Sequence, residues 1–401
     1  MKPKIRIKGF NDAWEYSYLY NCLEISTEVN KENKYGKDEV LSVSDDFGVV
    51  NQIKHLGRSY AGKSVSGYKI LLPGQIVYTK SPLRDKPFGI IKENNYQAGI
   101  VSVLYAVYNV KEGIFSKYIQ RYFEPKQRIN KYLVPLVNKG AKNTMNISDE
   151  MSLNGKITKP VTICEQQAIC SYFDKVDELI STASSRLASL KQVKEASLQA
   201  MFPQKGEIVP KIRFKGFEGE WEEVLLGSLF SERVENDVTA EMLSVTMHDG
   251  IIKANENGRY DNSNSDRSNY KLVLKDDIAY NTMRMWQGAS GCSPYSRGIV
   301  SPAYTVITPN VGVCSVFFAF YFKTNGLINK FRLNSQGLTK DTWNLKYPAF
   351  SNISVLYPTN VLEQQQIASY FTSLDKQIAL QTQRLEKLKQ IKAACLDKMF
   401  V

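Results

Sequence analysis

Histidine is scarce in this chain, which has only two, His55 and His248, among its 401 residues. They occupy different positions in the two similar halves described below, so a duplicated histidine-based catalytic site is excluded. The sequence contains no Pro-Pro dipeptide, no GxGxxG turn and no HExxH motif, and we expect no phosphate-binding P-loop. Because these patterns mark common cofactor-binding and metal-dependent catalytic sites, their absence favours a chain without a catalytic centre of its own.

Long apolar runs and clustered cysteines are also missing. The longest apolar run, residues 311–322, is shorter than the roughly 20 residues that a membrane-spanning helix needs. The first residues lack the apolar core of a secretory signal. The six cysteines are scattered without a CxxC pair, which argues against a disulfide framework or a zinc site. We therefore expect a cytoplasmic protein that holds no metal.

The composition is that of a folded protein with a basic surface. Hydrophobic residues make up 43% and charged residues 23% of the chain, which are globular values. A length of 401 residues is enough for two or three domains. The formal net charge of +12 is suited to contact with a polyanion, so nucleic acid is the partner that the charge favours.

The chain repeats itself with a period of roughly 200 residues, far longer than a solenoid unit. The opening segment Lys4-Ile5-Arg6-Ile7-Lys8-Gly9-Phe10, followed by Trp14, returns as Lys211-Ile212-Arg213-Phe214-Lys215-Gly216-Phe217, followed by Trp221. The strongest match closes each half, where residues 165–202 return as residues 363–400 and both copies run from Glu-Gln-Gln to Met-Phe. Each copy is therefore a whole domain with an appendage.

The two appendages are predicted to be long helices that pair with each other. Apolar residues recur at steps of three and four, and neither segment contains proline or glycine. About 38 residues make a rod of roughly 55 Å, which outruns one domain and favours an antiparallel coiled coil. The predicted seam consists of Ile169, Phe173, Val176, Ile180, Leu187 and Leu190 in the first helix and of Ile367, Phe371, Leu374, Ile378, Leu385 and Leu388 in the second, and the same stripe continues to Val193 and Ile391.

The segments between the helices have a different texture. Residues 40–110 and 242–310 are rich in Val, Ile, Tyr and Thr, in short runs broken by Gly, Pro, Asn and Asp, which is typical of strands and turns. Residues 115–133 and 316–333 are predicted to be helical. The fold class is therefore α+β, with two similar mixed α/β domains joined by two long helices in a pseudo-two-fold repeat. Trp14 and Trp221 are expected in the domain cores.

The paired Glu-Gln-Gln helices, the Gly-Phe-x-x-x-Trp openings and the loop of residues 280–288 resemble the specificity subunit of type I restriction-modification enzymes. The resemblance covers essentially the whole chain. It implies target recognition domains at 1–160 and 211–358, conserved helices at 161–202 and 359–401, and a linker at 203–210. It also implies a DNA-recognition role, partnership with two methyltransferase subunits and with restriction subunits, and S-adenosylmethionine, ATP and Mg2+ on those partners alone. Because the globular segments differ more than the helices, we expect a bipartite, non-palindromic site.

Loops with basic and amide side chains are the predicted points of DNA contact. Arg suits guanine, and Asn or Gln suits adenine in the major groove, whereas Lys more often contacts phosphate. Each half has two such loops, which align between the halves. Residues 79–87 align with residues 280–288, and residues 139–143 align with residues 337–341. The candidates are Thr79, Lys80, Arg84, Lys86, Lys139, Lys142, Asn281, Arg284, Gln287 and Lys340.

Two other classes of function stay open at this point. One is a standalone duplicated DNA-binding protein with an internal coiled coil, and the other is a scaffold whose helices recruit a different effector. Matched polar positions outside the seam, Gln166 with Gln364 and Arg186 with Arg384, favour a partner-binding subunit, although such residues also form ordinary solvated faces. A nuclease centre of scattered carboxylates would leave little trace in the sequence; a methyltransferase would need a Pro-Pro motif, which is missing.

Overall fold

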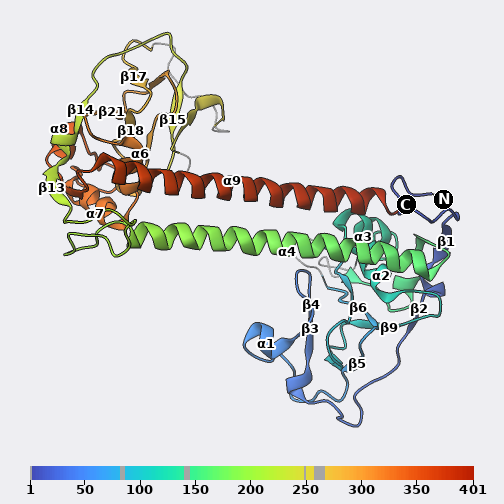
Figure 1. Cartoon of the computed structure of the whole chain (residues 1–401). Coiled ribbons are helices and arrows are strands. Elements are labelled where there is room, and N and C mark those ends of the chain that lie inside the picture. The colour runs from blue at the N-terminus through green and yellow to red at the C-terminus, as the bar shows by residue number, and fades with distance from the viewer. Residues whose placement is uncertain (1, 82–85, 140–144, 248–249, 257–266) are drawn as a thin grey trace. The chain divides into compact units, whose positions relative to one another are not determined.

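The computed structural model describes residues 2–81, 86–139, 145–247, 250–256 and 267–401. The chain divides into two compact units, of which unit 1 comprises residues 1–184 and 383–401 and unit 2 comprises residues 185–382. Each unit is a mixed α/β body that includes parts of two long helices (Figure 1). The predicted fold class is therefore confirmed.

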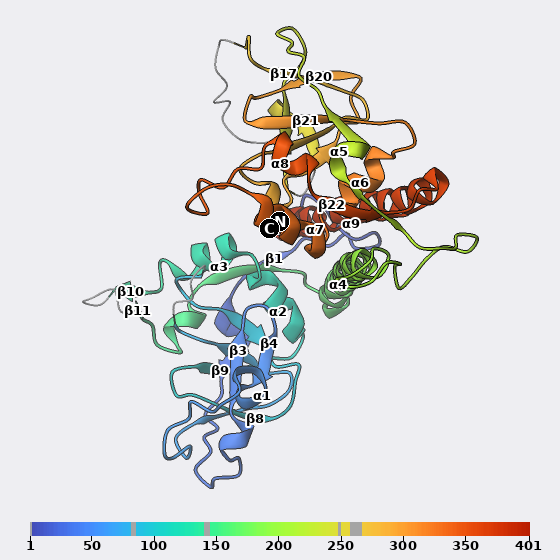
Figure 2. The same ribbon diagram turned by 90° about the vertical axis from the view of Figure 1, so that its left-hand side faces the viewer.

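Short antiparallel strands form the sheets of unit 1. The central four-stranded sheet has the order β2-β9-β6-β7, and further strand pairs join β1 to β12, β3 to β4, β5 to β8 and β10 to β11. The strand bounds are Glu15–Tyr18 (β1), Leu23–Ile25 (β2), Leu41–Ser44 (β3), Gly48–Asn51 (β4), Lys69–Leu71 (β5), Ile76–Tyr78 (β6), Ile91–Glu93 (β7), Gly99–Val101 (β8), Ala106–Val110 (β9), Asn138–Lys139 (β10), Met145–Asn146 (β11) and Lys156–Lys159 (β12). Figures 1 and 2 show α1 (Gln52–Leu56) away from β1 within this unit.

Unit 2 repeats the same strand order, as the sequence repeat predicts. Its central sheet has the order β14-β21-β18-β19, and the pairs β13 with β22, β15 with β16 and β17 with β20 take the places of their counterparts in unit 1. The strand bounds are Glu222–Leu225 (β13), Phe230–Glu232 (β14), Leu243–Val245 (β15), Ile251–Lys253 (β16), Lys271–Leu274 (β17), Ile278–Asn281 (β18), Ser290–Cys292 (β19), Arg297–Val300 (β20), Tyr304–Pro309 (β21) and Ser354–Tyr357 (β22).

Each predicted domain helix is in fact a pair of shorter helices. Residues 115–133 form α2 (Ser116–Phe123) and α3 (Lys126–Leu133). Pro125 lies between them in an extended conformation, and its missing N–H cannot continue the first helix. In unit 2, α6 (Ser315–Tyr321) and α7 (Asn325–Asn334) are divided at Thr324, which is also extended. The remaining short helices are α5 (Leu226–Leu229) and α8 (Tyr347–Ser351).

The two long helices are α4 (Ile163–Ala200) and α9 (Val361–Lys398). In unit 1 the first part of α4 pairs with the last part of α9, and the Tyr172 hydroxyl lies 3.2 Å from Cys395 Sγ. In unit 2 the Tyr370 hydroxyl lies 2.9 Å from Ser197 Oγ, which is the repeat equivalent of the same contact. Within each unit the helices therefore run antiparallel, as predicted, because low-numbered residues of one helix face high-numbered residues of the other.

Most of the predicted seam is buried at these helix pairs. Ile169, Phe173, Val176, Ile367, Phe371, Leu374 and Leu385 are buried, and Ile180, Leu187, Leu190, Ile378 and Leu388 are partly buried. The extension of the stripe to Val193 and Ile391 was wrong, since these side chains are 46% and 40% exposed. At these positions the neighbouring lysines face the other helix instead: Lys194 pairs with Asp375 of α9, and Lys392 pairs with Asp177 of α4.

The Met-Phe pair that ends each long helix packs into the core of the other half. Phe400 stacks on Phe173 at 6.0 Å between ring centroids and meets Trp14 edge-on at 6.5 Å. In unit 2, Phe202 stacks on Phe371 and meets Trp221 edge-on. The two tryptophans are core residues, as predicted. Each domain core is thus completed by a helix that belongs, in sequence, to the opposite repeat.

The repeated opening motif ties the ends of two helices together. Arg6 donates two hydrogen bonds to Glu165 in the first turn of α4, at 2.7 and 2.8 Å, while the Ile5 N–H donates to the carbonyl of Lys398 at the end of α9. In unit 2, Arg213 pairs with Glu363 and the Ile212 N–H donates to the carbonyl of Ala200. One short segment therefore satisfies a buried carboxylate at a helix start and a free carbonyl at a helix end.

Glutamine at the second position of Glu-Gln-Gln is also a structural residue. The Gln166 amide accepts a hydrogen bond from the Phe115 N–H and donates to the carbonyls of Gly113 and Pro160. Gln364 makes the equivalent bonds in unit 2. Both side chains are fully buried, so they fix the helix start to its own domain and are not open to a partner.

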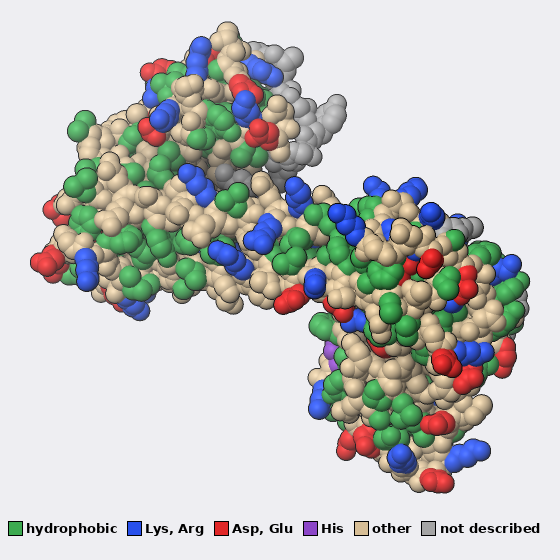
Figure 3. Space-filling model, turned by 45° about the vertical axis from the view of Figure 1, so that its right-hand side comes forward, with side chains coloured by type: hydrophobic (Ala, Val, Ile, Leu, Met, Phe, Trp, Pro, Cys, Tyr) green, Lys and Arg blue, Asp and Glu red, His purple; other side chains and the backbone are tan. Residues whose placement is uncertain are grey.

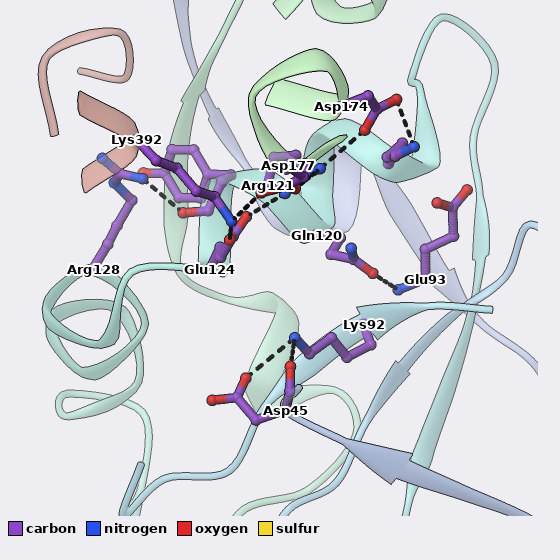
Figure 4. Close-up of polar contacts among 12 residues, drawn as sticks. Asp45, Lys92, Glu93, Gln120, Arg121, Glu124, Arg128, Asp174, Asp177 and Lys392 are labelled. Atoms are coloured by element: carbon purple, nitrogen blue, oxygen red, sulfur yellow. Dashed lines mark hydrogen bonds and ion pairs between the residues drawn. The ribbon is translucent and has the colours of Figure 1, made fainter. Parts of the chain in front are cut away.

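In unit 1 an ionic cluster joins three helices. Arg121 of α2 pairs with Glu124 and also with Asp174 and Asp177 of α4, and Lys392 of α9 bridges Glu124 and Asp177 (Figure 4). Unit 2 replaces the arginine with an aromatic ring. There Lys194 lies 5.6 Å from the centre of the Phe320 ring and pairs with Asp375. The same joint is therefore ionic in one unit and largely apolar in the other.

The ionic cluster makes unit 1 sensitive to acid. Burial raises the pKa of Glu124. The charges and hydrogen bonds of Arg121 and Lys392 lower this pKa by more than burial raises it, so the pKa lies below its usual value. The pKa of Asp174 is lowered in the same way by Lys117 and Arg121. Stability from lowered carboxyl pKa values is complete above the ordinary carboxyl pKa of about 4 and is lost as the pH falls through the folded-state values.

We therefore expect the urea midpoint of unit 1 to stay level from about pH 8 to pH 5 and to fall below about pH 4. Glu124→Gln should lower the midpoint at neutral pH and weaken its dependence on acid, because the titrating carboxylate is gone. Urea unfolding followed by hydrogen exchange in α2 measures both. An acid response of Glu124→Gln as steep as that of the wild type would contradict this assignment.

Candidate nucleic-acid interface

The loop between β18 and β19 of unit 2 holds three of the predicted DNA-contact residues on a rigid turn. Asn281 ends β18, and its Oδ1 accepts a hydrogen bond from the Met283 N–H at 3.0 Å. The short helix η6 (Met285–Gln287) follows, and Gly288 closes it with a φ of +84°. Met285 is fully buried and anchors this turn. Arg284 and Gln287 are exposed on its outer side.

A second predicted loop of unit 2 lies against the first. The Leu345 N–H donates to the carbonyl of Thr282 at 2.9 Å. The Trp286 and Trp343 rings meet edge-on, with 5.2 Å between their centroids. Lys340 is exposed in this second loop. The structure thus brings Asn281, Arg284, Gln287 and Lys340 onto two adjoining loops.

The electrostatics of these loops suit a phosphate or a base edge. Among the described residues, neither Arg284 nor Lys340 forms an ion pair with an acidic side chain. The Trp286 Nε1–H donates to the Met283 carbonyl, which stiffens the turn that carries Arg284. A guanidinium on a stiff turn, without a carboxylate partner, is available to an outside acceptor such as guanine O6 and N7.

The aligned loop of unit 1 is occupied by contacts of its own. Thr79 is 3% exposed, and its Oγ1 accepts a hydrogen bond from the Ile90 N–H. Lys86 is 9% exposed and contacts Asp45 and the carbonyl of Glu124. These two side chains face the domain interior, so they hold the loop in place. As DNA-contact residues they stay predictions that this packing does not favour.

Lys80 is held by an acid of unit 1. Its ammonium lies 2.5 Å from Asp149, which also binds Lys69 at 2.5 Å. Burial raises the pKa of Asp149, but the two lysines lower it by more than burial raises it. The pKa therefore lies below its usual value, and the carboxylate stays charged at neutral pH. Lys139 lies in β10. Arg84 and Lys142 lie outside the described residues.

The expectation that the sequence lacks the pattern of a phosphate-binding P-loop was wrong. Residues 57–64, Gly-Arg-Ser-Tyr-Ala-Gly-Lys-Ser, match the phosphate-binding pattern GxxxxGK[ST], and they follow α1 directly. In the structure Arg58, Tyr60 and Lys63 of this segment are exposed. The spacing of two glycines before Lys-Ser would have been enough to find them.

The rest of the surface carries charges of both signs. Figure 3 shows Lys and Arg interspersed with Asp and Glu on the face in view, without one continuous basic patch. In the described part of the chain, no group of three or more His, Cys, Asp or Glu side chains could hold a metal ion. Among the same residues, no helix is long and apolar enough to cross a membrane.

The whole chain is similar in fold to a known protein. It matches the crystal structure of the S subunit of a type I restriction-modification system from M. genitalium with a TM-score of 0.58 and 13% identity, covering 100% of this chain and 99% of that one. A chain from a structure describing assembly and conformational transition of the type I R-M system matches with a TM-score of 0.50 and 14% identity, covering 96% and 97%. A search of curated proteins gave no match. The fold of the whole chain is therefore similar to that of the S subunit from M. genitalium.

A family model identifies one domain directly. Residues 220–390 match the type I restriction modification DNA specificity domain, which covers β13 to β22 and most of α9. The resemblance inferred from the repeated motifs is thus confirmed. Because unit 1 repeats the strand order of unit 2, the chain carries two copies of one architecture.

Proposed function

We propose that this chain is the DNA sequence-reading subunit of a type I restriction-modification complex, in which each unit reads one half of a bipartite, asymmetric site. The observation that carries the proposal is the duplicated fold with unlike loops. At the aligned positions Arg284 and Gln287 are exposed in unit 2, whereas Lys80 and Lys86 are bound to Asp149 and Asp45 in unit 1. Two domains with the same fold but different loops would recognise different half-sites.

In this proposal the long helices α4 and α9 hold two methyltransferase subunits, and restriction subunits join that core. Methyl transfer and DNA cleavage then belong to the partners, which would carry S-adenosylmethionine, ATP and Mg2+. What supports this division is the family match and the absence of a catalytic motif in the sequence.

Co-expression with the methyltransferase encoded nearest to this gene tests the proposal. Size-exclusion chromatography with mass measurement reports the complex, and sequencing of modified bases in the host DNA reports its target. Methylation at a split, asymmetric motif is the expected result. A lone chain with unmodified DNA would favour a standalone DNA-binding protein or a scaffold for another effector.

Replacing Arg284 should relax recognition at one base pair of one half-site. Arg284→Ala removes up to two hydrogen bonds to a guanine, and a good bidentate contact contributes about 1–3 kcal/mol of discrimination, on the order of tenfold to a hundredfold. Selection of bound sequences from a randomised duplex pool measures the change. Arg332→Ala, an exposed arginine of α7 bonded to Asn329, is the matched control and should leave the motif unchanged. Equal loss at every position of both halves would contradict base reading by Arg284.

A further inference from the structure

The segment that matches the phosphate-binding pattern does not form a nucleotide cradle. Such a loop lies between a strand and the start of a helix, whereas residues 57–64 follow the end of α1 and lead towards β5. Its backbone N–H groups are also engaged within the chain. The Tyr60 N–H donates to the Gln52 side chain, the Ala61 N–H to Ser59, and the Gly62 N–H to the Tyr68 hydroxyl. The amides are therefore not free to surround a triphosphate.

The side chains of the segment point outward from a firm base. Gly57 ends α1 with a φ of +75°, a left-handed conformation that glycine adopts without strain. Val65 is buried in a small cluster with Val40 and Ile100, against which Ala61 and Tyr68 also pack. The loop is thus held by its apolar residues, and Arg58, Tyr60 and Lys63 stay exposed.

Aromatic rings interleave with the cations on this side of unit 1. The Arg58 guanidinium lies over the Tyr60 ring, 4.6 Å from its centre. Phe47, in the turn between β3 and β4, is 67% exposed and lies 5.1 Å from the His55 ring. Rings beside cations are the usual composition of a nucleic-acid surface.

The acids of this region leave the cations free. Asp45, beside Phe47 in sequence, is bound by both Lys86 and Lys92. The exposed acids nearest in the chain or in contact with α1 are Asp38 and Asp46, and neither forms an ion pair with a cation of this surface. In the described part of the chain, Lys54, Arg58 and Lys63 have no acidic partner.

We infer that Lys54, Arg58 and Lys63 hold the phosphate backbone of duplex DNA at the half-site of unit 1. Together with the exposed rings of Phe47 and Tyr60, these three residues are named here the α1 surface. The inference rests on the proposed function and adds a contact beyond those of the described residues of the aligned loop in this unit. There Lys80 and Lys86 are bound to Asp149 and Asp45, so their charges are already balanced. The α1 surface offers three cations without an acidic partner among the described residues, Lys54 on α1 and Arg58 and Lys63 on the loop that follows it, and such cations suit contact with phosphates.

Salt dependence of DNA binding by the full chain tests the α1 surface. The probe is a fluorescent duplex of random sequence, and binding is followed by anisotropy. The test variant combines Lys54→Gln, Arg58→Gln and Lys63→Gln. The control variant combines Lys111→Gln, Lys126→Gln and Lys131→Gln, which removes the same charge from exposed positions elsewhere in unit 1. All six side chains are exposed, so both variants should keep the wild-type melting temperature.

The test variant should lower the slope of log Kd against log salt by about two to three, because each phosphate contact contributes roughly 0.9. The control should lower it by less than half a unit on the same scale. Equal slopes for the two variants would overturn the inference and leave the proposed function intact. A wild-type chain that binds no duplex at any salt would overturn both. Binding of Mg-ATP that is lost on Lys63→Gln would also overturn the inference, since the loop would then be a nucleotide site.

Discussion

Phe400→Ala should destabilise unit 1 by about 3–5 kcal/mol, the usual cost of truncating a buried aromatic side chain. The reason is its position. Phe400 is 4% exposed and contacts the rings of Trp14, Tyr118, Tyr122 and Phe173, so its loss leaves a cavity between two helices and a domain. Arg128 adds to the cost, because its guanidinium lies 4.8 Å from the Phe400 ring centre and donates to the Leu396 carbonyl.

Calorimetry with hydrogen exchange measures where the stability is lost. In Phe400→Ala, backbone hydrogen exchange should be faster than in the wild type in residues 383–398 and in α2, which both belong to unit 1. It should stay unchanged from β13 to β22. Phe202→Ala should give the mirror result, with the loss confined to unit 2. Ile391→Ala, at a 40% exposed position of the same helix, is the matched control and should cost no more than about 0.5 kcal/mol. If Phe400→Ala cost no more than Ile391→Ala, the core position of the ring would be refuted.

Arg6→Met should destabilise unit 1 by about 3 kcal/mol, because it leaves a buried carboxylate without its cation. Glu165 is 2% exposed, and after the change only the Trp14 Nε1–H still donates to it. Arg213→Met should do the same to Glu363 in unit 2, which is 1% exposed. Urea unfolding measures both, with Lys8→Met and Lys215→Met as controls that remove an exposed charge from the same motif.

The pairing of cation and acid can be separated from a loss of packing. Arg6→Met with Glu165→Gln should recover part of the stability, since an amide costs less to bury than an unpaired carboxylate. A double variant as unstable as Arg6→Met alone would show that the guanidinium acts through packing and not through its charge.

The long helices were predictable because one period runs through 38 residues without proline or glycine. Their last turns were not. The apolar steps continue through Val193 and Ile391, yet these side chains are exposed, because the adjacent Lys194 and Lys392 face the other helix and pair with its acids. A periodic pattern encodes which side of a helix is apolar, but it does not encode what that side meets.

The candidate site was predictable in one unit more than in the other. Arg284 and Gln287 are exposed as expected, since their turn is built on the neighbouring Met285 and Gly288. Thr79 and Lys86 face inward, because Thr79 accepts a hydrogen bond from the Ile90 N–H and Lys86 binds Asp45. Both partners lie outside the loop, so the sequence of the loop alone does not predict these contacts. The role of Arg6 and Arg213 was also hidden, because their carboxylate partners lie about 150 residues away, far beyond any local motif.

The crossed placement of Met201-Phe202 and Met399-Phe400 also sets an order in time. The Phe400 ring fits into an aromatic socket formed by Trp14, Tyr118 and Phe173. All three socket residues have been synthesised by the time the first part of α4 is made, whereas Phe400 comes much later in the chain. At a synthesis rate of 5–20 residues per second, about 200 further residues take roughly 10–40 s. Although its domain leaves the ribosome first, unit 1 is therefore the last to close, and its aromatic socket is open to chaperones or to aggregation throughout that interval.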